Sequence, residues 1–168
     1  MSADHCPTGP SPVPAADVPA PDEAQSAPPV HGQLAAQLAA SFEGTLVERL
    51  GMEVLSVGAG GGTMRMPVAG STQPAGLLHG GATIALAESI ASLAAVLRAR
   101  EVHGEGAQAV GTSVSALHHR SARDGWVTAT CTPRHLGRQV ASYLVDVHDE
   151  AGRLLSTITV STQLLPPR

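Results

Sequence analysis

The sequence predicts an α+β domain in which an antiparallel sheet curls around one long buried helix. A nearly continuous apolar segment at 82–99 is long enough for that helix. Two strand-like segments precede it and four follow it, each bounded by turn residues. Strands that are grouped in sequence, rather than alternating with helices, are typical of the α+β class.

The segments before the central helix are short. Apolar residues recur every fourth position from Leu34 to Leu46, which predicts an amphipathic helix over 33–50. Two strands are expected at 51–57 and 63–68, because a glycine-rich turn separates them.

The central helix is apolar almost all round, so we expect other structure to cover most of its sides. The C-terminal half then predicts a four-stranded meander, because apolar and polar residues alternate and turn signals such as Asp124-Gly125 intervene. The expected strands are 109–118, 125–133, 140–148 and 154–164.

Composition argues against several kinds of protein. All ten basic residues are Arg, the net charge is −4 and no basic cluster stands out, so no nucleic-acid partner is expected. Residues 1–30 hold eight of the thirteen prolines and no Arg, which predicts a disordered acidic tail before a domain over 31–168.

Cys6 and Cys131 are far apart and no leader is expected, which indicates a reduced, cytoplasmic protein. The apolar helix barely reaches spanning length and carries Glu88, so no membrane is expected.

The run from Gly76 to Ser89, GLLHGGATIALAES, carries the chemistry. Gly80 and Gly81 stand at the helix start, where free backbone N–H groups can stabilise a negative charge. Glu88 is an ionisable group that we expect to be buried in an apolar segment, which is costly unless it is paired or used. These features together predict chemistry on a carbonyl. Three polar residues can join them: Gln73 and His79 before the helix and Ser92 one turn after Glu88.

One helix cannot bring both groups to a single carbonyl. Eight residues separate Gly80 from Glu88, or about 12 Å of helix. A reacting group must lie about 3–3.5 Å from the atom that it attacks. We therefore expect the site to lie across a dimer interface, with Glu88 of one subunit facing Gly80 of the other.

Plainer interpretations exist for each residue alone: a satisfied structural Glu, a capping His and a glycine turn. Their combination favours the carbonyl hypothesis. The histidines at 79, 118, 119 and 135 match no zinc spacing, so no metal site is expected. A Ser-His-Asp triad is not supported either, because the sequence has no GxSxG turn.

The chain resembles hotdog-fold thioesterases of the PaaI-like group over about residues 40–165. The motifs that carry the resemblance are Gln73–Ala82, Leu86–Ser89, Val110–Thr112, His118–Arg120 and His135–Gln139. This subgroup contains the proofreading thioesterase of enterobactin biosynthesis and the 1,4-dihydroxy-2-naphthoyl-CoA thioesterase of the menaquinone pathway.

The resemblance implies hydrolysis of an aromatic or medium-sized acyl thioester, carried by coenzyme A or by a carrier protein. It implies no metal and no redox cofactor. The expected assembly is a homodimer that pairs into a dimer of dimers. Glu88 would be the nucleophile or general base, the Gly80 N–H would polarise the carbonyl, and Gly81 would lie at the substrate. Gln73 and His79 would position the thioester, and Ser92 would hold the water. The resemblance further implies substrate contacts for His118, His119, Arg120 and Arg138, the arginines at the phosphates or pantetheine arm.

The sequence departs from those relatives in its proline-rich tail and at Ala75, where they tend to carry Phe. A smaller residue there leaves the acyl group open. Two other functions remain as alternatives: a hotdog hydratase or dehydratase, which relies on an Asp/His pair, and a non-catalytic acyl-CoA-sensing module.

Overall fold

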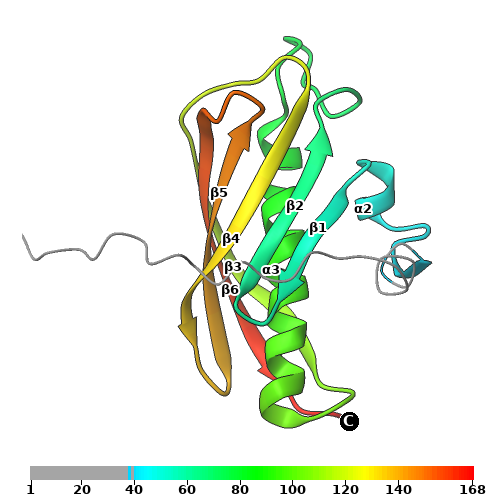
Figure 1. Ribbon diagram of the computed structural model, residues 1–168, viewed down its shortest axis with the longest axis vertical. Coiled ribbons are helices and arrows are strands. Elements are labelled where there is room, and N and C mark those ends of the chain that lie inside the picture. The colour runs from blue at the N-terminus through cyan, green and yellow to red at the C-terminus, as the bar shows by residue number, and fades with distance from the viewer. Residues whose placement is uncertain (1–37, 39) are drawn as a thin grey trace, which may run out of the picture.

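The computed structural model describes Leu38 and residues 40–168, so the predicted tail and the domain boundary at 30/31 lie outside the described residues (Figure 1). A long helix, α3 (Gly80–His103), packs in the curve of a six-stranded sheet and contacts all six strands. The predicted α+β architecture is confirmed. The remaining elements are α2 (Leu46–Arg49), β1 (Glu53–Gly58), β2 (Gly61–Pro67), β3 (Gln108–His118), β4 (Trp126–Leu136), β5 (Val140–Asp149) and β6 (Leu154–Leu165).

The strands pair antiparallel in the order β1-β2-β4-β5-β6-β3. The predicted four-stranded meander is therefore wrong: β4, β5 and β6 form one, but β3 pairs with β6 instead of β4. The connection over 119–125 is longer than the two to five residues usual in a hairpin, so it can carry the chain past two strands. This order leaves β3 as an 11-residue edge strand.

Alternation along the strands builds the core, as expected. On β4, Val127, Ala129 and Cys131 are buried beneath α3, while the threonines between them face the other side of the sheet. Burial raises the pKa of the Cys131 thiol to about 12, because the thiolate would lose its hydration. Burial also raises the pKa of Tyr143, whose hydroxyl donates to the Ala59 carbonyl.

The central helix is buried most deeply on one face. Its side toward the sheet buries residues such as Leu86 and Ile90 completely. The opposite side, which includes Glu88 and Leu93, is half-buried, so the expectation of cover on most sides is met only in part by the described residues. By length and apolar composition α3 could also span a membrane, but here it is the core helix of the domain.

The predicted helix over 33–50 is not continuous within the described residues. The chain turns at Phe42–Gly44 before α2 begins, and the Thr45 N–H donates to the Phe42 carbonyl at 2.9 Å. Gly44 has φ +74°, a conformation that ends a helix and that glycine adopts at no steric cost.

Candidate active site

A tightly held loop leads into α3. The His79 N–H donates to the Ser71 carbonyl at 2.9 Å, and the Leu78 N–H donates to the Ala122 carbonyl at 2.8 Å. Within the loop the Gln73 N–H donates to the Leu77 carbonyl at 2.8 Å. These bonds fix the backbone that carries Gln73 and His79 to the N-terminus of the helix.

His79 caps α3 with its side chain. Its Nδ1 accepts a hydrogen bond from the Gly81 N–H at 2.8 Å, so this amide is already used. In the neutral imidazole the proton then resides on Nε2, which can act as a donor. The Gly80 N–H donates to no acceptor among the described residues. Of the two predicted amide donors, Gly80 alone is free to bind an oxyanion, at the positive end of the helix dipole.

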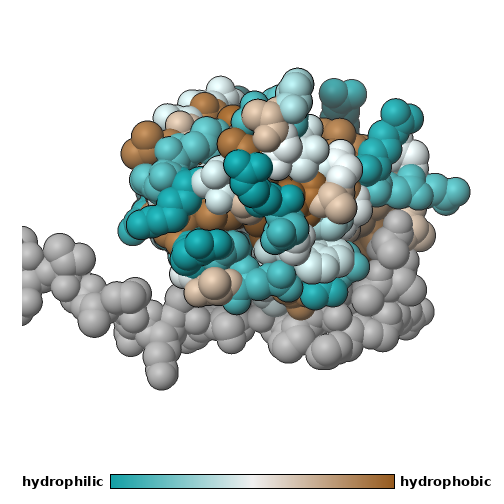
Figure 2. Space-filling view, turned by 90° about the horizontal axis from the view of Figure 1, so that it is seen from above, coloured by the Kyte–Doolittle hydropathy of each residue, from teal (hydrophilic) through white to brown (hydrophobic). Residues whose placement is uncertain are grey.

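A first cavity of about 420 Å³ opens at this end of the molecule, the end that Figure 2 views from above. Hydrophilic residues predominate on that surface, with apolar ones visible between them. The cavity brings together five residues predicted for the site: Gln73, Gly80, His118, His119 and Arg120. Its other lining residues, which the sequence analysis did not single out, are Leu77, Leu78, Thr83, Ser121, Leu155 and Ser156.

His118 packs directly against the start of α3. Its Nδ1 lies 2.8 Å from the Ser156 hydroxyl, and a methyl group at position 80 would lie 2.8 Å from its Nε2. Any side chain at Gly80 would therefore displace this imidazole. His119 has a different partner from His118. Its Nε2 lies 3.1 Å from the Thr157 hydroxyl, which in turn donates to the Asp146 carboxylate.

Glu88 and Ser92 lie in a second cavity, of about 350 Å³, between α3 and the segment around α2. Phe42, Leu46 and Val47 form its other wall. Glu88 is half-buried, so the expectation of a fully buried carboxylate is wrong. Within the described residues it accepts no hydrogen bond and forms no ion pair, which leaves its oxygens available to a ligand.

Seven of the ten predicted site residues thus divide between two cavities of one chain, while His79, Gly81 and Arg138 line neither of them. Gly80 lines the first and Glu88 the second, and about 12 Å of helix separates them. No single carbonyl can contact both groups of the same protomer.

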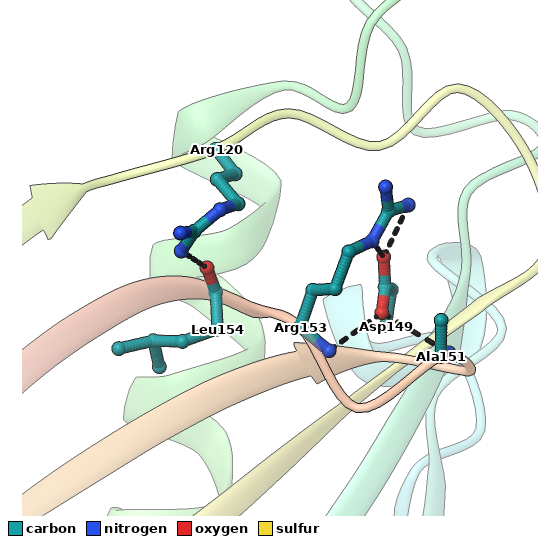
Figure 3. Close-up of polar contacts among 5 residues, drawn as sticks. All are labelled: Arg120, Asp149, Ala151, Arg153 and Leu154. Atoms are coloured by element: carbon teal, nitrogen blue, oxygen red, sulfur yellow. Dashed lines mark hydrogen bonds and ion pairs between the residues drawn. The ribbon is translucent and has the colours of Figure 1, made fainter.

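The two arginines expected to meet the phosphates lie far apart. Arg120 donates to the Leu154 carbonyl at 3.0 Å beside the β5–β6 turn, where Arg153 pairs with Asp149 (Figure 3). That pairing holds the pKa of Asp149 below its usual value. Arg138 lies at the opposite end of α3, a helix of about 36 Å, where its carbonyl contacts His103 Nε2 at 2.7 Å.

Comparisons with known proteins agree with this architecture. Residues 75–156 match the sequence profile of the Thioesterase superfamily. The chain is 44% identical over 129 residues to the proofreading thioesterase EntH of Cronobacter turicensis, covering 76% of this chain and 91% of that protein. The EntH of Klebsiella pneumoniae is also 44% identical, over 131 residues, with 77% and 93% covered.

The chain belongs to the thioesterase superfamily. Among solved structures, a thioesterase from Haemophilus influenzae superposes with a TM-score of 0.73 at 32% identity, covering 82% of this chain and 94% of that one. A variant thioesterase from Pseudomonas aeruginosa gives 0.72 at 32% identity, with 79% and 94% covered. The resemblance to hotdog thioesterases is confirmed, and the protein is a thioester hydrolase.

Proposed function

We propose that this thioesterase hydrolyses an acyl-CoA thioester at a site shared by two protomers, with Glu88 of one acting on a carbonyl held by Gly80 of the other. The observation that carries the proposal is the position of both half-sites beside the edge strand β3. Glu88 abuts Gly111, and Gly80 abuts His118, near the two ends of that strand.

Pairing of two β3 strands accounts for the separation. Gly111 and His118 are seven residues apart, about 23 Å along a strand. They are equally distant from a point near Val114 and Ser115. An antiparallel partner centred there lays Gly111 of one protomer beside His118 of the other, which brings Glu88 toward the partner's free Gly80 N–H.

In this arrangement the Gly80 N–H donates to the thioester carbonyl and stabilises the oxyanion that forms there. Gln73 and the Nε2–H of His79 position the thioester, and Ser92 holds a water beside Glu88. Two routes fit. Glu88 can take a proton from that water, which attacks the acyl carbon, and pass it to the departing thiolate. Alternatively, Glu88 attacks the acyl carbon, the thiolate leaves, and water cleaves the resulting anhydride to restore the carboxylate.

The acyl group is aromatic or of medium size. The second cavity has apolar walls and a volume of about 350 Å³, which suits such a group beside Glu88. The resemblance to the proofreading thioesterase of enterobactin biosynthesis, a name that the relatives share, favours an aryl substrate linked to siderophore synthesis. Arg120 would contact the carrier arm, His118 and His119 would approach the substrate, and the chain would act in the cytoplasm as a dimer of dimers. A panel of aryl- and alkyl-CoA thioesters, read by thiol release, tests the acyl preference.

Subunit complementation tests the shared site. Glu88→Ala and Gly80→Ala variants, each inactive alone, are unfolded together, refolded as a mixture and assayed for thiol release. If the site is shared, random pairing makes about half of the dimers mixed. Each mixed dimer has one intact site of its two, so the mixture should regain about a quarter of the wild-type number of sites. If both groups acted from one chain, every site in the mixture would be defective. The absence of recovery in confirmed mixed dimers would refute the proposal.

A further inference from the structure

Gly111 on β3 lies beside the carboxylate of Glu88. A methyl group at position 111 would lie 2.9 Å from Oε1 and 4.0 Å from Cδ of Glu88, and among the described residues it would meet no other atom within 4 Å beyond its chain neighbours. Real methyl carbons essentially never approach an oxygen to under 3.0 Å. The space left by the missing side chain is therefore occupied by a carboxylate oxygen.

The backbone at this position does not require glycine. Gly111 is absent from the glycines with positive φ, so an L-residue can adopt its conformation without strain. It lies within the ladder opposite Thr162 on β6. An added side chain at this position would therefore displace the carboxylate and would not strain the backbone.

A β-bulge fixes Gly111 where it stands. The register of β3 on β6 shifts between Gly111 and Ser113, which leaves Thr112 as the extra residue. The Thr112 hydroxyl donates to the Ser161 carbonyl at 3.1 Å and anchors the bulge to β6. The position of the backbone facing Glu88 is thus held by the sheet.

Glu88 itself has no polar partner among the described residues that could hold its rotamer. Its position depends on the shape of the surface around it. We propose that Gly111 is a positioning residue, whose lack of a side chain admits the Glu88 carboxylate to the place from which it acts. This inference rests on the role proposed above for Glu88.

The test compares Gly111→Ala with Gly60→Ala. Gly60 is a matched control, because it lies in the β1–β2 turn, lacks a positive φ and has open space where a methyl group would be added. The added methyl at 111 must push the carboxylate by several tenths of an ångström, and a displacement of 1 Å can cost about 100-fold in rate. We expect Gly111→Ala to lower kcat at least tenfold with little change in KM, and Gly60→Ala to lower neither.

A second pair of variants separates this inference from the proposed function. In the Glu88→Gln background, Gly111→Ala should lower the residual rate far less than it does alone, because both changes act on one group. Equal losses in the two backgrounds would overturn the positioning role. Full turnover by Glu88→Gln would instead refute the role of Glu88. If Glu88→Gln is inactive but Gly111→Ala is fully active, only the positioning role of Gly111 is refuted.

Folding provides an independent readout. If Gly111→Ala lowers the melting temperature or prevents folding, Glu88→Ala in the same chain should restore stability, since Glu88 is the only side chain in the described part of the chain that the methyl meets. A double variant as unstable as Gly111→Ala would show that the methyl clashes elsewhere and would overturn the inference.

Discussion

At the residue scale, the site depends on groups that are left free. The carboxylate of Glu88 has no donor or cation within the described residues, and the Gly80 N–H has no acceptor. A free acceptor and a free donor of this kind are what a water nucleophile and a developing oxyanion require.

Glu88→Ala should lower kcat by about 10²–10⁴-fold, the usual contribution of a positioned acid or base. Thiol release from an aryl-CoA measures it. Glu105→Ala is the control, because Glu105 is an exposed carboxylate beyond the end of α3. A Glu88→Ala variant with wild-type turnover would exclude both the nucleophile and the base roles.

Sequence reasoning found residues that lie close to one another along the chain and missed their distant partners. Gln73, His79 and Gly80 lie within eight residues of each other, so their meeting at the helix start was predictable. Ser156, which contacts His118, could not be found. It faces His118 only because β3 pairs with β6, and the local alternation of apolar and polar residues does not predict which strands pair.

At the scale of elements, the N-cap residue of α3 has a structural role and a proposed chemical role. His79 occupies the N-cap position, and its side chain satisfies one of the amides that a helix leaves unpaired. The cap uses only Nδ1, so substitution can separate the capping role of His79 from its proposed contact with the substrate through Nε2.

His79→Ala should lower the free energy of unfolding by about 1 kcal/mol, the typical loss of an N-cap. His79→Asn should retain most of that stability, because an Asn oxygen can accept from the same amide. Both variants should lose turnover if Nε2 acts on the substrate. Urea unfolding measures the change in stability, and thiol release measures the change in turnover. Full turnover by His79→Asn would show that His79 acts only as a helix cap.

Strand positions were predicted closely, and the errors lie at the ends of elements. The prediction stopped the fourth strand at Pro133, yet β4 continues to Leu136, because a register shift between Pro133 and His135 accommodates the proline. Similarly, the predicted apolar segment stopped at residue 99, whereas α3 continues through polar residues to His103, since hydrophobicity marks the buried part of a helix and not its length.

At the scale of the whole molecule, the strand order decides where a second copy can bind. Both β1 and β3 are edges, but β3 is the longer, and the two half-sites adjoin it. The meander predicted from sequence would have placed 109–118 beside 125–133 and left 154–164 as the edge. The local alternation was right and the topology was not, because a long connection hides which strands become neighbours.

Leu117→Glu should weaken dimerisation, since Leu117 is 63% exposed on β3 and a charge there opposes an apolar interface. Leu55→Glu is the matched control, on the opposite edge strand β1 and 38% exposed. Light scattering and turnover per chain, both across a dilution series, measure the effect. We expect loss of activity at low concentration for Leu117→Glu only. An unchanged dimer, or an active monomer, would contradict pairing through β3.

The two cavities have different walls, and this bears on how the enzyme can diversify. Of these two cavities, Phe42, Leu46 and Val47 line the one that holds Glu88, while Leu77, Leu78 and Leu155 line the one that holds Gly80. Mutations near α2 can therefore accumulate without altering the Gly80 amide that is proposed to bind the oxyanion. A lineage of such enzymes is free to acquire new substrates by small changes in one short segment of the chain.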